Sequence, residues 1–271
     1  MDVLIEQYFD FSIMNDNFDR VLDGFWYTVK LALIATVCAL AWGLFLAVLR
    51  QLPGRFFVPI RGLSLRGFMR QLPGRTAGPV RGVTIGYIDV FRGVPIVLVM
   101  LYISGSFGVL ASEGVIPEWL GIPRWLGQPD NFWYGVFALT LCYGAYMAEV
   151  YRAGIEAIPH GQREAARSLG MSHGQAMRYV IVPQAVRKVI PPLLNDVIAL
   201  YKDTALVAFI GLTELTQVGR DVQSETFNSS VLTLGAVLYL ALTIPLARVV
   251  DRLIAGQQEK FQRGMPAGGG V

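Results

Sequence analysis

Acidic and polar side chains recur at helical spacing in an apolar stretch near residue 200. Asp196 and Asp203 are seven residues apart, two turns of an α-helix, so they share one helical face, and Asn195 and Lys202 form a neighbouring stripe with the same spacing. Charges in an apolar segment are costly, so they usually face a bundle interior or a watery path and have partners there. The stripe therefore either lines a path for a polar molecule or pairs with another helix or subunit.

The chain lacks the usual parts of a membrane enzyme or pump. No G-x-x-x-x-G-K-S/T phosphate loop and no H-E-x-x-H zinc motif is present. The two histidines, His160 and His173, have no cysteine near them, so a zinc site is not expected. Cys38 and Cys142 fall inside apolar runs and are expected to be buried, inert thiols. We therefore expect no catalytic residue, no metal and no cofactor in this chain.

A polar, helix-forming segment at residues 164–183 interrupts the apolar chain. Its first half contains good helix formers and ends at Gly170, where a helix can stop. Ser172 is a good N-cap, and Gln175 three residues later completes a capping-box pattern, while Pro183 marks the expected end of the second helix. The pattern predicts two short helices joined by a tight turn. An ordinary loop with two surface helices is the alternative.

The remaining chain has the composition of an integral membrane protein. It has 271 residues, of which 54% are hydrophobic and 16% charged, and a mean hydropathy of +0.47, which is too apolar for an ordinary soluble domain. At about 1.5 Å per residue, an apolar helix of some 20 residues crosses a hydrocarbon core of about 30 Å. We expect an all-α fold with five spans, at about 25–49, 90–110, 132–154, 192–211 and 229–250.

The charges of the connecting segments alternate along the chain. Residues 1–24 are acidic and have no basic region before the first span, so a cleaved signal peptide is not expected. The segments 50–82 and 155–191 and the tail 256–271, with the end of the last span, carry an excess of Lys and Arg, which marks the cytoplasmic side. The pattern predicts an extracytoplasmic N-terminus and a cytoplasmic C-terminus.

The first basic segment contains a tandem repeat. RQLPGRFFVPIRG at 50–62 recurs as RQLPGRTAGPVRG at 70–82. The simpler interpretation is a duplication that lengthened a loop, and the alternative is a patch that binds anionic lipid or nucleic acid. We favour the duplication, and expect membrane lipid but no nucleic acid as a partner.

Several motifs together resemble one family. The segment 164–183 resembles the cytoplasmic EAA motif of ATP-binding-cassette importer permeases, in the polar amino-acid uptake branch of the type I family. Residues 91–95 resemble F-R-G-T-P at the start of the second span, and 145–149 resemble A-Y-x-A-E. The likeness covers residues 25 to 255 and departs at Val182, where leucine is commoner. The EAA match consists of Glu164, Ala165, Ala166, Gly170, Ile181 and Pro183.

The resemblance implies a type I importer permease fold, a location in the bacterial inner membrane and separate roles for several subunits. The chain would pair with an identical or similar permease, two ATPase subunits that bind ATP and Mg, and an extracytoplasmic solute-binding protein. The helix pair with Glu164, Ala165, Ala166, Gly170 and Pro183 would dock in a groove of the ATPase, with Glu164 capping or pairing within its helix. Side chains expected along the path of an amino-acid substrate are Glu149, Asn195, Asp196, Lys202, Asp203 and Thr204.

Three other hypotheses compete with amino-acid import. The first is an importer for another small polar solute. The second is a membrane scaffold whose basic loop recruits an anionic partner and which transports nothing. Copurification of a stoichiometric ATPase subunit would separate import from the scaffold. An intramembrane enzyme is disfavoured because the chain shows no constellation of nucleophile, base or metal ligands.

Overall fold

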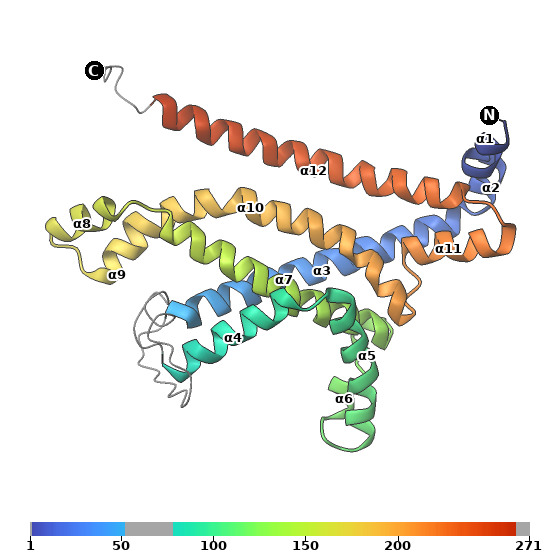
Figure 1. Ribbon diagram of the computed structural model, residues 1–271, viewed down its shortest axis with the longest axis horizontal. Helices are drawn as coiled ribbons and strands as arrows, with labels where there is room; N and C mark the ends of the chain where they lie inside the picture. Colours follow the sequence, from blue (N-terminus) through green and yellow to red (C-terminus); the bar gives the residue numbers. More distant parts are fainter. Residues whose placement is uncertain (1, 52–77, 264–271) are drawn as a thin grey trace, which may run out of the picture.

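The computed structural model describes residues 2–51 and 78–263, whose regular structure is entirely helical (Figure 1). Most of the tandem repeat at 50–62 and 70–82, and the end of the tail at 256–271, lie outside the described residues. The α-helices are α1 Asp2–Phe9, α2 Phe11–Asp16, α3 Phe18–Gln51, α4 Pro79–Gly93, α5 Ile96–Ser112, α6 Glu118–Gly121, α7 Asp130–Glu156, α8 His160–Ser168, α9 His173–Ala176, α10 Val182–Asp203, α11 Leu215–Thr226 and α12 Ser230–Arg263. Short 3₁₀ turns at Trp125–Gly127 and Thr204–Ile210 and a π turn at Met177–Ile181 complete the path.

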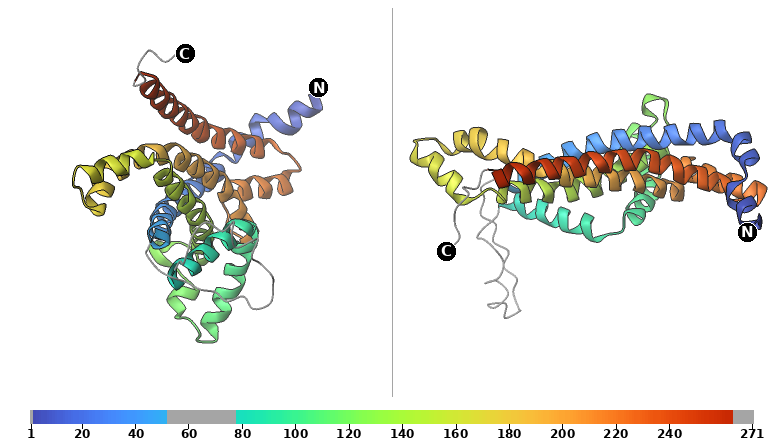
Figure 2. Two further views of the ribbon diagram at one scale, coloured as in Figure 1. Left: turned by 60° about the vertical axis from the view of Figure 1, so that its left-hand side comes forward. Right: turned by 90° about the horizontal axis from the view of Figure 1, so that it is seen from above.

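The long helix α7 forms the centre of an elongated bundle. Helices α3, α7, α10 and α12 run along the long axis of the molecule (Figures 1 and 2). Of the 27 residues of α7, 14 are buried, including the large side chains Phe132, Leu139 and Met147. They pack against small buried residues of α3, such as Ala35 and Ala39. Small side chains on one helix let the backbone of the other come close, which explains the tight α3–α7 pair.

Two glycines and a tryptophan mark the closest approach of α3 to α7. A Cβ atom added to Gly43 would lie 2.9 Å from the carbonyl oxygen of Gly144. A Cβ atom added to Gly144 would lie 2.5 Å from Cδ1 of Trp42. The Trp42 Nε1 in turn donates to the Tyr87 hydroxyl of α4 at 2.8 Å, so it is held in place from a third helix.

We expect Gly144→Val to lower the thermal unfolding midpoint of the purified protein. The new side chain would push on Trp42, and overpacking of this kind costs about 1–3 kcal/mol. Circular dichroism or a thiol-reactive dye assay in detergent measures the midpoint. The matched control is Gly86→Ala, because a Cβ atom there meets nothing within 4 Å. An equal midpoint for both variants would contradict the close packing.

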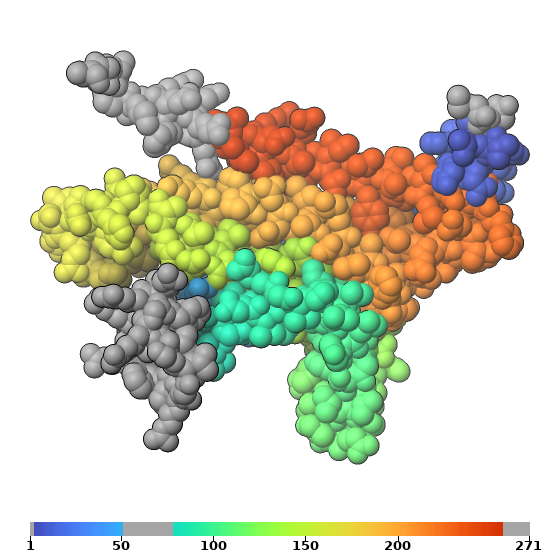
Figure 3. Space-filling view, viewed as in Figure 1, coloured from blue at the N-terminus to red at the C-terminus, as the bar shows by residue number. Residues whose placement is uncertain are grey.

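Helices α4 and α5 meet at a sharp bend, which differs from the expected single span at 90–110. The two helix axes differ by 107°, and the chain leaves α4 at Val94 with an extended backbone (φ −93°, ψ 134°). Pro95 explains the break, because a proline excludes the preceding residue from the α region and has no N–H to donate. Figure 3 shows α5 and α6 projecting from the side of the bundle.

Helix α10 also differs from the prediction, in which a helix ended at Pro183 and a span began at residue 192. The chain runs from α9 through the π turn into α10 without a break, and Pro183 lies in the first turn of α10. In the π turn the backbone hydrogen bonds join residues five apart instead of four. This change falls just before Pro183, which has no N–H to donate, so the helix continues past the proline. Pro191 and Pro192 lie inside the helix.

The two ends of the bundle carry different parts of the chain. At one end, α1 and α2 are tied to the loop before α12, where Ser229 N–H donates to the Gln7 carbonyl at 2.9 Å. The Arg20 guanidinium pairs with Glu225 at 2.8 Å and holds the pKa of that carboxyl below its usual range. At the opposite end lie α8 and α9 (Figure 1).

Two helices in the described part of the chain are long and apolar enough to cross a membrane, Phe18–Arg50 and Ser230–Gly256. A third is added if the bent pair α4 and α5 counts as one span. Helix α7 has 27 residues, which is enough by length to cross a membrane, and more than half of them are buried. The expected total of five spans stays a prediction.

Candidate functional site

The turn between α8 and α9 has the geometry of a Schellman motif. Gly170 has a φ of +81°, which costs glycine little and other residues more. Its N–H donates to the Arg167 carbonyl at 2.9 Å, and the Met171 N–H donates to the Ala166 carbonyl at 3.2 Å. These two bonds satisfy the last carbonyls of α8 and close the turn. The predicted helix stop at Gly170 is confirmed.

The start of α9 is capped as predicted. The Ser172 Oγ accepts from the Gln175 N–H at 3.3 Å, and the Gln175 side chain accepts from the Ser172 N–H at 2.8 Å. Residues 170–174 also spell G-x-S-x-G, the spacing of a hydrolase nucleophile. Here the serine follows a helix and a turn, not a strand, and its hydroxyl caps a helix, so this match has no catalytic geometry.

In the described part of the chain, the helix pair contacts the bundle from one side. Ile158, Ile181 and Ala185 form a small buried cluster between the end of α7 and the start of α10, and Ala166 is also buried. Met177, Val180 and Ile181 lie together at this contact. The opposite surface is open, with the Leu169 side chain 80% exposed.

The residues of the EAA match divide between these two sides. Glu164, Ala165 and Gly170 are exposed, and Ala166 faces inward. Pro183 is exposed at the start of α10. Among the described residues, Glu164 makes no hydrogen bond or ion pair, so its carboxylate does not cap or pair within α8. It is accessible to a second protein.

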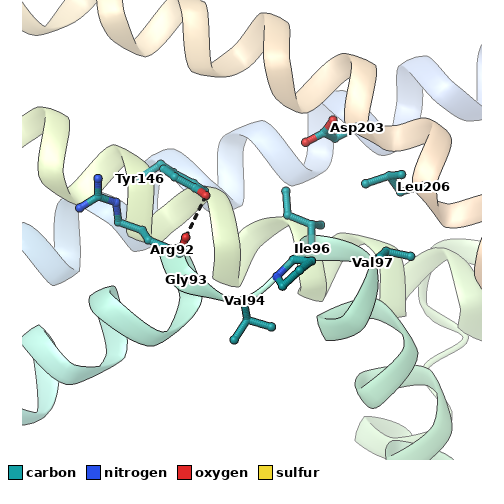
Figure 4. A pocket seen from close by; sticks show the side chains of 9 residues that line it. Arg92, Gly93, Val94, Ile96, Val97, Tyr146, Asp203 and Leu206 are labelled. Carbon is teal, nitrogen blue, oxygen red and sulfur yellow. Dashed lines mark hydrogen bonds between the residues drawn. The ribbon is translucent and has the colours of Figure 1, made fainter.

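A pocket of about 420 Å³ lies at the bend between α4 and α5 (Figure 4). Its walls come from three places far apart in the sequence: the bend itself, α7, and the end of α10. The lining residues are Arg92, Gly93, Val94, Pro95, Ile96, Val97, Tyr146, Asp203 and Leu206.

Polar groups of both signs border this pocket. The Asp203 Oδ2 accepts a hydrogen bond from the Tyr143 hydroxyl at 2.8 Å. The Arg92 guanidinium lies 5.7 Å from the centre of the Tyr146 ring at the other edge, and the Tyr146 hydroxyl donates to the Arg92 carbonyl at 3.3 Å (Figure 4). Ile96 and Val97 begin α5, and the first N–H groups of a helix have no partner within it. The pocket is therefore bordered by a carboxylate, by an arginine and by a helix N-terminus.

The other predicted path residues have different environments. Asp196 lies two turns before Asp203, and its Oδ2 is buried with no hydrogen-bond partner among the described atoms. Asn195 and Lys202 are exposed on the neighbouring face. Thr204 is fully buried, and its hydroxyl donates to the Tyr201 carbonyl at 2.6 Å.

Glu149 lies apart from the pocket, near the end of α7. It forms ion pairs with Arg50 of α3 and Arg152 of its own helix. The structure therefore brings Asp203 to the pocket and places Glu149 in a separate charged cluster.

Sequence reasoning did not assign Arg92, Tyr143 or Tyr146 to the site. Arg92 and Tyr146 do fall in the two short motifs at 91–95 and 145–149, which were the available signal. Tyr143 lies in an apolar run and gave no signal, because its hydroxyl partner is 60 residues away.

Comparisons with known proteins agree on one family. Residues 74–257 match the family described as "Binding-protein-dependent transport system inner membrane component". The probable glutamine ABC transporter permease protein GlnM of Bacillus subtilis is 31% identical over 243 residues, 89% of this chain and 95% of that protein. The arginine transport system permease protein ArtQ of the same organism is 30% identical and covers 87% of this chain and 91% of its own length.

A solved structure shows the same architecture. The crystal structure of an amino acid ABC transporter with histidines contains a chain that superposes with a TM-score of 0.69 at 32% identity. The match covers 89% of this chain and 96% of that chain.

Proposed function

Since this chain belongs to the family of binding-protein-dependent transport system inner membrane components, we propose that it is the permease subunit of an ATP-binding-cassette importer for a polar amino acid. It is a multi-pass protein of the inner membrane. The observation that carries the substrate class is the pocket at the α4–α5 bend, which both Asp203 and Arg92 line.

The pocket matches the two charges that every amino acid carries. Asp203 accepts the ammonium group, and Tyr143 fixes the orientation of that carboxylate through its hydrogen bond. The substrate carboxylate meets the N-terminus of α5 at Ile96, where unpaired N–H groups and the helix dipole favour an anion. Arg92 adds a positive charge at the rim, held against Tyr146. Asp196 extends the polar surface along the same face of α10.

The helix pair α8–α9 is the coupling element. Its open surface, with Glu164 and Leu169, docks in a groove of a separate ATPase subunit that binds ATP and Mg. Movement of that subunit tilts the attached ends of α7 and α10, a rigid-body change of the kind used in alternating access. The remaining partners are a second identical or similar permease chain and an extracytoplasmic solute-binding protein.

The proposed topology has five spans, with the N-terminus outside and the C-terminus in the cytoplasm. Two observations support it: α1 and α2 lie at the end of the bundle opposite α8 and α9 (Figure 1), and α12 extends toward the α8–α9 end. Helices α7 and α10 cross the membrane packed against each other in the bundle.

Reconstitution tests the function directly. The permease, the ATPase and the solute-binding protein are placed in proteoliposomes, and ATP-dependent uptake of radiolabelled glutamine, arginine, histidine and glutamate is measured. We expect uptake of at least one of them, with competition by its unlabelled form. Copurification without any ATPase subunit would favour the scaffold hypothesis, and uptake of only non-amino-acid solutes would overturn the substrate class.

A further inference from the structure

A four-membered charge cluster joins the end of α3 to the end of α7. Glu149 of α7 accepts from Arg50 of α3 with one carboxylate oxygen. Its other oxygen accepts from the Nε of Arg152, one turn further along α7, at 2.8 Å. Arg152 also pairs with Glu156. Glu149 is therefore the only member among these that bonds to a second helix and to its own helix at once.

The cluster is best shielded from solvent where the two helices meet. The side chain of Glu149 is 15% exposed and that of Arg50 is 19% exposed, whereas Glu156 is 62% exposed. Exposed ion pairs contribute little, but removing one partner of a shielded pair leaves the other charge without compensation. The Arg50–Glu149 pair is thus the strong link of the cluster.

This link lies beside the origin of the coupling element. Helix α7 ends at Glu156, and α8 begins at His160. The same end of α7 is attached to α10, because Lys188 donates to the Ala157 carbonyl at 2.7 Å and a Cβ atom on Gly154 would overlap the Val189 side chain at 2.0 Å. The coupling element therefore reaches α10 by direct packing. It reaches α3 through the α3–α7 packing, which includes Leu46 and Ala148, and at the very end of the two helices through the ion pair.

We propose that Glu149 is a positioning residue of the transport cycle. Through Arg50 it adds to the α3–α7 packing by fixing the end of α3 to the end of α7, so that this end of α3 follows α7 when the ATPase displaces α8 and α9 and hydrolysis and substrate movement stay coupled. The proposal rests on the proposed function. It differs from the expectation that Glu149 lies along the substrate path, because its carboxylate is engaged at the α3–α7 contact and does not line the pocket.

The test compares Glu149→Gln, Arg50→Gln and their double variant in the reconstituted complex. We expect the amino acid transported per ATP hydrolysed to fall about tenfold in each single variant, within the range of ordinary coupling energies. The ATPase rate and the Michaelis constant for uptake should stay near those of the wild type. The double variant should be no worse than either single one, since both remove the same link. Arg50→Lys should keep at least half of the coupling.

Arg152→Gln is the matched control, because it removes a partner of the same carboxylate but leaves the link to α3 in place. Hydrogen exchange of residues 44–50 and 149–156 gives a readout that needs no transport. Glu149→Gln should raise exchange in both segments, and Arg152→Gln in the α7 segment alone. Unchanged coupling in both single variants, or an equal loss in Arg152→Gln, would overturn the proposal. If the wild-type complex transports no amino acid but the variants still show these changes in exchange relative to it, the proposed function is wrong, and the structural link between Arg50 and Glu149 is still supported.

Discussion

Gly170→Asp is expected to abolish amino-acid uptake while the chain remains in the membrane at normal amounts. Gly170 has a φ of +81°, and a residue with a Cβ in that region costs about 1–2 kcal/mol. The new carboxylate also lies at the C-terminal end of α8, where the helix dipole disfavours a negative charge. Most of the effect comes from the docking surface, because an unmatched charge in a protein interface costs several kcal/mol. We expect uptake to fall by at least about a hundredfold.

The measurement is uptake in proteoliposomes together with capture of the ATPase by the tagged permease. Gly114→Asp is the matched control, since Gly114 also has a positive φ, +70°, and open space where a Cβ would lie, but belongs to the connection after α5, outside the coupling element. It repeats the backbone cost without a charge on the docking surface, so uptake should stay within about twofold of the wild type. Gly170→Ala isolates the cost of the backbone conformation. Normal ATP-driven uptake by Gly170→Asp would contradict the coupling role.

Asp203→Asn is expected to lower kcat/KM for uptake about 10- to 100-fold, because a hydrogen bond to a charged group contributes about 1.5–3 kcal/mol. The substitution is conservative in shape, and the amide oxygen can still accept from the Tyr143 hydroxyl, which now donates at 2.8 Å. The fold should therefore persist, and only the attraction for the substrate ammonium is lost. The ATPase should remain bound and active.

Initial rates of uptake over a range of substrate concentrations check this prediction. Asp89→Asn is the matched control, since Asp89 is an exposed carboxylate on α4 near the bend that does not line the pocket. Asp196→Asn should change uptake in the same direction by a smaller factor. Wild-type kinetics in both Asp196→Asn and Asp203→Asn would remove the α10 stripe from the substrate path.

Local features were predicted correctly, and the clearest case is the turn at Gly170. The Schellman motif and the capping box at Ser172 each involve residues within six positions of one another. Hydrogen bonds over such short separations depend on residue type and little else. The same local rules failed at Pro183 and at residues 90–95. The helix continues past Pro183 because a π turn precedes it. The single span predicted at 90–110 is divided by the bend at Val94 and Pro95.

The pocket and the charge cluster could not be predicted, because both join residues that are far apart in the chain. Tyr143 and Asp203 are 60 positions apart, and Arg50 and Glu149 are 99 positions apart. A carboxylate in an apolar segment needs a partner, and the sequence alone does not say which one. Glu149 shows the consequence: its charge marked it for the substrate path, and packing placed it at the α3–α7 contact.

The sequence by itself determined the membrane class, the helical fold, the presence of a helix pair in the segment 164–183 and, through the motifs around it, the family. These follow from composition, from hydrogen bonds within a few residues and from short motifs. Only the tertiary structure decided which polar side chains meet at the α4–α5 bend and which lock α3 to α7. The physical reason is that small residues such as Gly43 and Gly144 determine how the helices pack. That packing determines which group lies close enough to each buried charge to pair with it.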